Sequence, residues 1–147
     1  MSLHALSSLD GRYEKETSPL REFFSEFAYL RSRTRLELDF LTALSKLGIC
    51  PRPNISLDSF SDEDALKIQE YEKTTRHDVK AIEYFLRDKL KNELHQWIHF
   101  GLTSEDVNNI AQALALKESR DQVLLPALDS LISTLIDFAK NIVLCRC

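Results

Sequence analysis

The chain has 147 residues, of which 44% are hydrophobic and 29% are charged. That length suffices for one domain with a core of its own, or for part of a larger protein. The net charge of −4 argues against a broad basic surface for nucleic acid. We find no run of about 18 consecutive apolar residues and therefore expect no membrane span, and the first residues do not have the pattern of a signal peptide.

The three cysteines, Cys50, Cys145 and Cys147, are few and odd in number. In a chain without a recognisable signal peptide, this usage favours reduced thiols and a cytoplasmic location. Cys145 and Cys147 could bind a metal ion only together with distant partners. Ordinary thiols are the better interpretation, and we expect no metal site at this pair.

The composition favours helices over strands. Glycine occurs only three times, and leucine, alanine, glutamate, lysine and arginine dominate. Stretches with a clean two-residue alternation of apolar and polar side chains are missing, which argues against half-buried strands. The sequence therefore predicts an all-α fold.

The first predicted elements are a turn and a long helix. The run Asp10-Gly11-Arg12-Tyr13 has the composition of a turn. Ser18 can cap the helix that follows, and Pro19 fits its first position. Apolar residues then recur at helical spacing until Gly48, a natural helix stop. We expect one continuous helix between these two points.

Residues 48–60 contain two prolines and are expected to form a loop. Ser61-Asp62-Glu63-Asp64 resembles a capping box and should begin a short helix that ends near Lys73. Thr74 or Thr75 is then expected to cap the next helix. The apolar positions of that helix are Val79, Ile82, Phe85, Leu86 and Leu90.

In the last third of the chain, we expect a short buried segment around Trp97, Ile98 and Phe100. A helix that begins at Thr103 or Ser104 should follow it. Pro126 should kink or restart this helix. Residues 127–139 are apolar on more than one side, as expected of a helix packed inside a bundle or between subunits. Such a surface calls for a partner or for a continuation of the chain.

Two polar runs are the strongest functional signals: Thr74-Thr75-Arg76-His77-Asp78-Val79-Lys80 and His99-Phe100-Gly101-Leu102-Thr103-Ser104-Glu105-Asp106. Each combines cations, hydroxyls and carboxylates at a predicted helix start, where free N–H groups and the helix dipole favour an anionic ligand. The plainer alternative is that these side chains only cap their helices. Spacing alone leaves both interpretations open.

Two weaker signals complete the set. His95 and His99 are four residues apart, a spacing that can place two imidazoles on one helical face for zinc. Gln96 stands where the metalloprotease motif requires glutamate, and no clear third ligand follows, so a packing role is favoured. Arg12 and Tyr13 could present a guanidinium and a phenol to a phosphate, or could simply lie on a surface turn.

Taken together, these runs resemble the adenylosuccinate lyases of the fumarase/aspartase superfamily. The match includes Asp10-Gly11-Arg12-Tyr13, the run 74–86 and the run 99–109, in the order and at the intervals of the longer bacterial branch. The resemblance implies an N-terminal helical domain over residues 1–110. It also implies that residues 111–147 begin the central long-helix bundle domain, here truncated.

The implied reaction is the β-elimination of fumarate from adenylosuccinate, giving AMP, and from the succinyl-carboxamide ribotide of purine biosynthesis. The resemblance implies that Arg12 and Tyr13 bind near the substrate phosphate. Arg76, His77 and Asp78 would line the nucleotide site, and Thr103 and Ser104 would contact the succinyl or phosphate oxygens. It implies no metal and no cofactor, and a homotetramer as the full-length assembly.

The general-acid histidine of the family lies in a Thr-His-Gly-Gln segment, and the catalytic serine lies in a later flexible loop; neither occurs in these 147 residues. We therefore expect no catalytic residue among them and little activity from this chain alone. One rival is another superfamily member, such as argininosuccinate lyase or fumarase, which should lack the Arg76-His77-Asp78 run. The other rival is a non-catalytic helical interaction domain.

Overall fold

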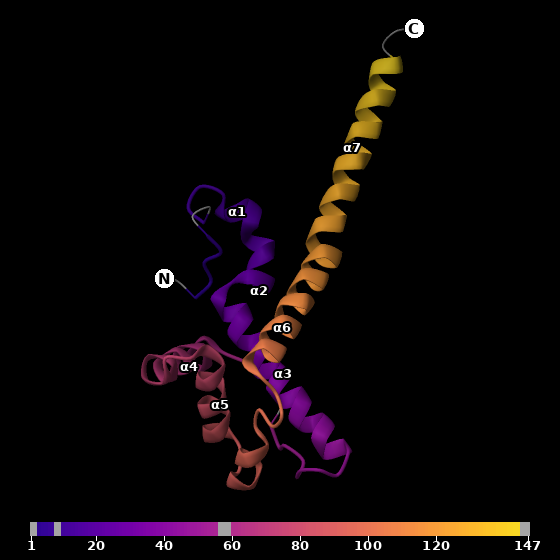
Figure 1. Cartoon of the computed structure of the whole chain (residues 1–147). Coiled ribbons are helices and arrows are strands. Elements are labelled where there is room, and N and C mark those ends of the chain that lie inside the picture. Colours follow the sequence, from indigo (N-terminus) through magenta and orange to yellow (C-terminus); the bar gives the residue numbers. More distant parts are fainter. Residues whose placement is uncertain (1–2, 8–9, 56–59, 145–147) are drawn as a thin grey trace.

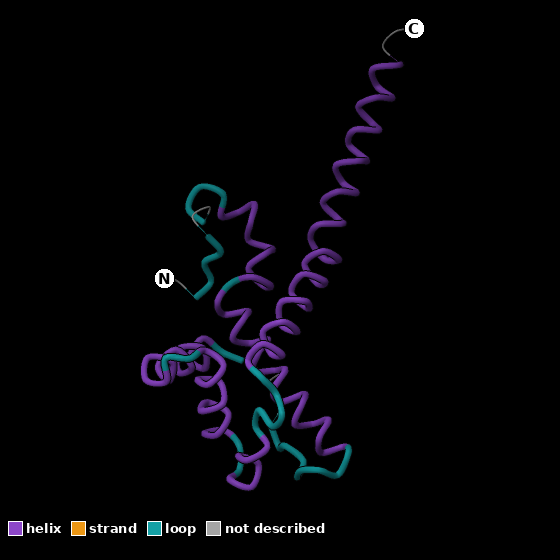
Figure 2. Tube along the Cα trace, in the orientation of Figure 1, coloured by secondary structure: helices purple, strands orange, loops and turns teal. Residues whose placement is uncertain are grey.

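The computed structural model describes residues 3–7, 10–55 and 60–144. Within these ranges every regular element is helical, which confirms the all-α prediction (Figure 2). The elements in chain order are α1 (Glu14–Thr17), the 3₁₀ helix η1 (Ser18–Leu20), α2 (Arg21–Phe24), α3 (Glu26–Lys46), α4 (Asp62–Thr75), α5 (Asp78–Lys89), the 3₁₀ helix η2 (Asn92–Trp97), α6 (Ser104–Ser119), the π-helical turn η3 (Arg120–Leu124) and α7 (Leu125–Leu144).

The long first helix of the sequence-based prediction is interrupted. Ser25 has an extended backbone, with ψ at 159°, and its hydroxyl accepts a hydrogen bond from the Ala28 N–H at 3.2 Å. It therefore caps α3, and the segment before it forms the separate short helices η1 and α2. The prediction of one continuous helix from Ser18 was wrong, because Ser25 competes with the backbone for hydrogen bonds. The end of α3 agrees with expectation, since Gly48 follows it with φ at +73°.

Helix α3 is the central element of the packed body. It contacts α2, α4, α5 and α6, and α4 packs against α5 (Figure 1). The core is built from residues of α3, α4, α5 and the segment after α5. Its fully buried apolar side chains include Leu41, Ile68, Ile82, Phe85, Leu86 and Leu94.

The capping box predicted at Ser61 forms and the helix start predicted at Thr103 or Ser104 is a capping box as well, whereas the predicted cap of α5 does not form. Ser61 with Asp64 begins α4, and Thr103 with Asp106 begins α6. The expectation that Thr74 or Thr75 caps α5 was wrong, because α4 continues through Thr75. His77 is the N-cap of α5 instead.

The segment 97–100 is only partly buried. Ile98 lies in the core, but the Phe100 side chain is 48% exposed and packs edge-on against Trp97. The expectation of burial was therefore wrong for Phe100. His99, between these residues, has φ at +60° and turns the chain toward α6.

The last helix passes Pro126 without a break. The wider turn η3 precedes the proline, and the Leu125 N–H bonds to the Arg120 carbonyl, five residues back. This geometry accommodates a residue that has no N–H to donate. Residue 110 lies inside α6, so the helix crosses the expected domain boundary without interruption.

Helix α7 projects away from the rest of the chain as a rod (Figure 1). Its large apolar side chains, among them Leu128, Leu131, Ile132, Leu135, Ile136 and Phe138, are each about half exposed or more. By length and composition alone, the helix Ser104–Ile142 could cross a membrane, a possibility that the count of consecutive apolar residues had not indicated. Helix α7 thus has the exposed apolar surface that the sequence predicted for residues 127–139.

Candidate functional site

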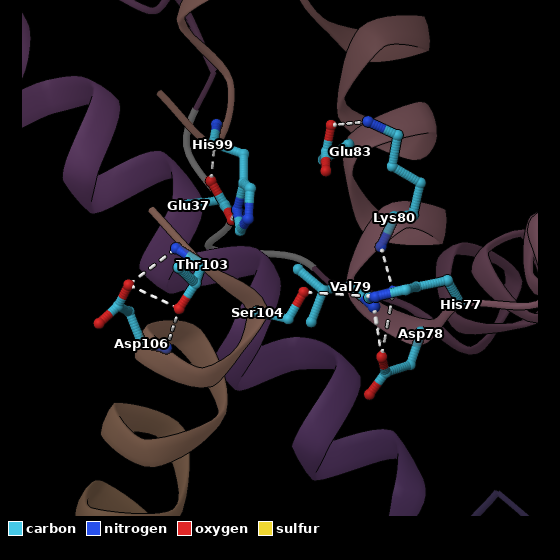
Figure 3. A network of polar contacts seen from close by, with 10 residues as sticks. All are labelled: Glu37, His77, Asp78, Val79, Lys80, Glu83, His99, Thr103, Ser104 and Asp106. Atoms are coloured by element: carbon cyan, nitrogen blue, oxygen red, sulfur yellow. Dashed lines mark hydrogen bonds and ion pairs between the residues drawn. The ribbon is translucent and has the colours of Figure 1, made fainter. Parts of the chain in front are cut away.

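The two polar runs meet where α5 and α6 begin. The Nε2 atom of His77 lies 3.4 Å from the hydroxyl oxygen of Ser104, although the residues are 27 positions apart (Figure 3). His77 caps α5, and Ser104 is the first residue of α6. The His77 side chain is 49% exposed, so a ligand can reach this contact from solvent.

His77 is oriented by its own helix. Its Nδ1 atom accepts a hydrogen bond from the Lys80 N–H at 3.3 Å. When the imidazole is neutral, this bond places the ring proton on Nε2, because one nitrogen must accept while the other donates. His77 therefore presents an N–H donor on the side that faces Ser104.

Asp78 connects the start of α5 to α3. One carboxylate oxygen accepts from the N–H of Val79 at 2.8 Å, and the other lies 3.2 Å from the Arg33 guanidinium. Arg33 belongs to α3, and its side chain is only 15% exposed. Asp78 is thus committed to positioning the helix start, with little freedom left to bind a ligand.

Arg76 lies in the left-handed region, with φ at 52°, at the end of α4. Its N–H closes the helix by bonding to the Glu72 carbonyl at 2.7 Å. A left-handed backbone is uncommon for a residue with a Cβ atom, and it lets the chain reverse before α5. The Arg76 side chain is exposed beside His77 in sequence.

Thr103 is the N-cap of α6. Its hydroxyl donates to an Asp106 carboxylate oxygen at 2.9 Å and accepts from the Asp106 N–H at 3.4 Å. The backbone N–H of Thr103, followed by its hydroxyl, lowers the pKa of Asp106 below its usual value. The Thr103 hydroxyl is therefore occupied by capping, whereas the Ser104 hydroxyl faces His77.

A buried pair adjoins these helix starts. Glu37 of α3 is fully buried, and its carboxylate lies 2.6 Å from Nδ1 of His99 and accepts from the His99 N–H at 3.1 Å. Burial raises the pKa of Glu37, while the His99 contacts oppose that shift. Glu83, which pairs with Lys80 at 2.8 Å, also raises it.

Sequence reasoning missed Arg33 and Glu37, although one of them carried a signal. Glu37 lies within the apolar stripe of its helix, three residues after Thr34 and four before Leu41, and all three are buried. An acidic residue in such a stripe needs a partner. Arg33 gave no such signal, because arginine on a long helix is ordinarily solvated.

Arg12 and Tyr13 do not join this cluster within one chain. Their side chains are exposed, and the Arg12 guanidinium lies over the Tyr13 ring, 5.4 Å from its centroid. Figure 1 places the segment before α1 well away from the start of α6. The expected turn at 10–13 is present.

The two histidines considered for zinc are held by different partners. His95 Nε2 lies 3.1 Å from the Leu90 carbonyl oxygen, and His99 pairs with Glu37. His99 follows η2 rather than continuing a helical face. Among the residues that the structure describes, no group of three or more potential metal ligands gathers; Cys145 and Cys147 lie outside them.

Comparisons with known proteins agree with the motifs. The profile of a lyase family matches residues 53–143. The chain is 41% identical over 95% of its length to the adenylosuccinate lyase of Haemophilus influenzae. The corresponding values are 44% over 94% for the enzyme of Escherichia coli and 39% over 95% for that of Dictyostelium discoideum.

The chain spans about a third of the length of these relatives, 34% of each. This share agrees with the expectation that it corresponds to the N-terminal portion. The family match also identifies the all-α fold as that of the fumarase/aspartase superfamily. The chain belongs to this lyase family, and the relatives named above are adenylosuccinate lyases.

Proposed function

We propose that this chain supplies nucleotide-binding residues of an adenylosuccinate lyase. The reaction is the elimination of fumarate from adenylosuccinate, giving AMP, and from the succinyl-carboxamide ribotide of purine biosynthesis. The observation that carries the proposal is the contact between His77 and Ser104. It brings two helix starts from separate family motifs to one exposed place.

The chemistry of this place suits an anionic nucleotide. The helix starts offer backbone N–H groups and the positive ends of two dipoles. His77 offers an N–H donor, Ser104 a hydroxyl, and Arg76 an exposed cation. We assign these three residues to the nucleotide, with Asp78 and Thr103 shaping the site through their helix starts.

Arg12 and Tyr13 are proposed to approach the substrate phosphate from another copy of the chain. Their exposure and their separation from the start of α6 favour this arrangement (Figure 1). The exposed apolar face of α7 favours self-association. We propose a cytoplasmic homotetramer for the full-length protein, with α7 in a bundle of long helices.

The general acid and base are proposed to come from segments outside these 147 residues. Elimination requires a base at the carbon beside a carboxylate and an acid at the departing nitrogen. We expect the 147-residue chain to bind nucleotide but to release little fumarate. Robust fumarate release from the purified chain would contradict this division of roles.

Binding of AMP tests the proposal directly. In titration calorimetry, AMP should bind the 147-residue chain, and His77→Ala or Ser104→Ala should weaken binding by about tenfold, because each removes one hydrogen-bonding group. His95→Gln is the matched control, since His95 bonds to Leu90 outside the site. No AMP binding by the unmodified chain would instead favour a non-catalytic interaction domain that acts through α7.

A further inference from the structure

One face of α3 contacts the two segments that form the proposed site, which we call its arms: the start of α5 at Asp78 and the segment at His99 that leads into α6. Arg33 and Glu37 are four residues apart on α3, so their side chains leave the same side of the helix one turn apart. Arg33 holds Asp78 at the start of α5, and Glu37 holds His99 in the segment that leads into α6. The two arms therefore share one rigid support.

The Glu37 contact constrains both the backbone and the ring of His99. The His99 backbone lies in the left-handed region, a conformation that is strained for a residue with a side chain. Its N–H donates to one oxygen of Glu37, and its ring lies against the other. An unpaired carboxylate could not remain at this fully buried position.

An ionised Glu37 also determines which ring nitrogen carries the proton. A carboxylate can only accept hydrogen bonds, so Nδ1 of His99 must donate. Nε2 is then left as an acceptor, and it has no hydrogen-bond partner among the described residues. A neutral His77 has the opposite arrangement, with Nδ1 accepting from the Lys80 N–H and Nε2 carrying the proton.

We propose that Arg33 and Glu37 are positioning residues of the nucleotide site, with Arg33 setting the start of α5 and Glu37 setting the backbone and protonated nitrogen of His99. The inference rests on the proposed function, because it assumes that a nucleotide binds between these arms. It adds a donor–acceptor pair: His77 presents N–H, and His99 presents a free ring nitrogen. Such a pair suits a ligand that carries both an acceptor and a donor.

Glu37→Gln gives a sharp test, because an amide offers one acceptor and one donor. The His99 N–H still requires the acceptor, so the amide NH₂ must face the ring. We expect nitrogen-15 NMR to find the His99 proton on Nδ1 in the unmodified chain and on Nε2 in the variant. AMP binding should weaken by about tenfold, the size of one lost hydrogen bond.

The control comes from the same helix. Arg35 is exposed and pairs with Asp39 at 3.7 Å, so Arg35→Gln repeats the chemistry of Arg33→Gln at a pair that includes neither Asp78 nor His99. It should leave the His99 proton and AMP affinity unchanged. If Glu37→Gln fails to fold by circular dichroism, Arg33→Gln decides instead: it should weaken AMP binding severalfold, and Arg33→Lys should restore part of the loss.

The outcomes separate the two proposals. If the unmodified chain binds no AMP, the proposed function is wrong. If it binds AMP while Glu37→Gln, or Arg33→Gln in its place, leaves the affinity unchanged, only the positioning role is wrong. A proton found on Nε2 of His99 in the unmodified chain, or an unchanged protonated nitrogen in a folded Glu37→Gln variant, also overturns it.

Discussion

The packed body and the projecting helix α7 use apolar side chains in opposite ways. Phe85 is 1% exposed in the body, whereas Phe138 in α7 is 64% exposed. The body contains its own core, contributed by four elements. Helix α7 is more apolar than α3, α4 or α5, yet its large apolar side chains stay exposed in the described chain. The contrast separates a body that holds the proposed site from a helix whose exposed apolar face is proposed to bind other copies.

The largest effect should follow from removing an aromatic ring in the core. Phe85→Ala should lower the free energy of unfolding by about 3–5 kcal/mol, since a fully buried ring leaves a cavity. The matched control is Phe138→Ala, which should change it by less than about 0.5 kcal/mol in dilute, unassociated protein. Urea unfolding monitored by Trp97, the only tryptophan, measures both. Equal losses of unfolding free energy in the two variants would contradict the difference in burial between the two regions.

A smaller effect is expected at the cap of α6, where the site adjoins the long helix. Thr103→Ala removes the hydroxyl that bonds to Asp106 and should cost about 1 kcal/mol of unfolding free energy. Thr134→Ala removes a hydroxyl inside α7 that bonds only to the Ser130 carbonyl, and it should have almost no effect. The same urea titration compares them, and a cost at Thr134 equal to that at Thr103 would contradict the assignment of the cap.

Acid should weaken the body through two reciprocal ion pairs between α4 and α5: Lys67 with Asp88 at 2.7 Å, and Lys89 with Asp64 at 3.0 Å. Lys67 lowers the pKa of Asp88. Burial raises the pKa of Asp64, but the contacts with Lys89 and Ser61 outweigh burial, so the pKa of Asp64 is also lowered. Because both folded-state pKa values lie below the unfolded ones, the stabilisation is present above about pH 4 and is lost as the pH falls through the folded values.

The acid effect should be modest, because the lysines are about half exposed and salt screens them. Unfolding midpoints measured from pH 6 to pH 2 should fall, and Asp88→Asn should reduce the slope. Asp137→Asn in α7, whose carboxylate lies 3.7 Å from the Lys140 ammonium with both side chains about 70% exposed, is the control and should leave the slope intact. A flat pH profile in the unmodified chain would exclude this contribution.

The smallest effect on stability, and the clearest effect on association, should come from α7. Leu135→Ser removes an apolar side chain that is 57% exposed and should leave the unfolding of the body unchanged. Sedimentation should nevertheless show weaker self-association, because less apolar surface is available to bury. Lys91→Ser, at an exposed position between α5 and η2, is the control. A well-behaved monomer in the unmodified chain would remove the basis for α7 as an oligomer interface.

Local signals in the sequence predicted the fold well where the decisive contacts are local. The capping box at Ser61, the helix start at Thr103 and the stop at Gly48 depend on neighbours within three residues, and all three are present. The break at Ser25 was missed, because a single serine within an apolar helical pattern usually does not interrupt it. The cap at His77 was missed, because threonine is the commoner cap and Thr75 stands two residues before His77.

The candidate site divides in the same way. The runs around His77 and Ser104 were recognised from residue types and spacing, and the structure brings them together. Arg33 and Glu37 act across 45 and 62 positions in the sequence, on Asp78 and His99. A partner at that distance leaves no periodic trace in a single chain. The supporting residues Arg33 and Glu37 could therefore be identified only from the fold, whereas the exposed polar residues could be recognised from the sequence.

The π-helical turn before Pro126 determines the direction in which the projecting helix faces. Each residue advances a helix by about 100°, so one extra residue in a turn rotates everything beyond it by that angle. The turn Arg120–Leu124 thus fixes the angle about the helix axis between the side of α6 that packs on the body and the apolar stripe of α7. Deleting one residue there would leave the body intact and rotate that stripe by about a quarter of a revolution relative to the body.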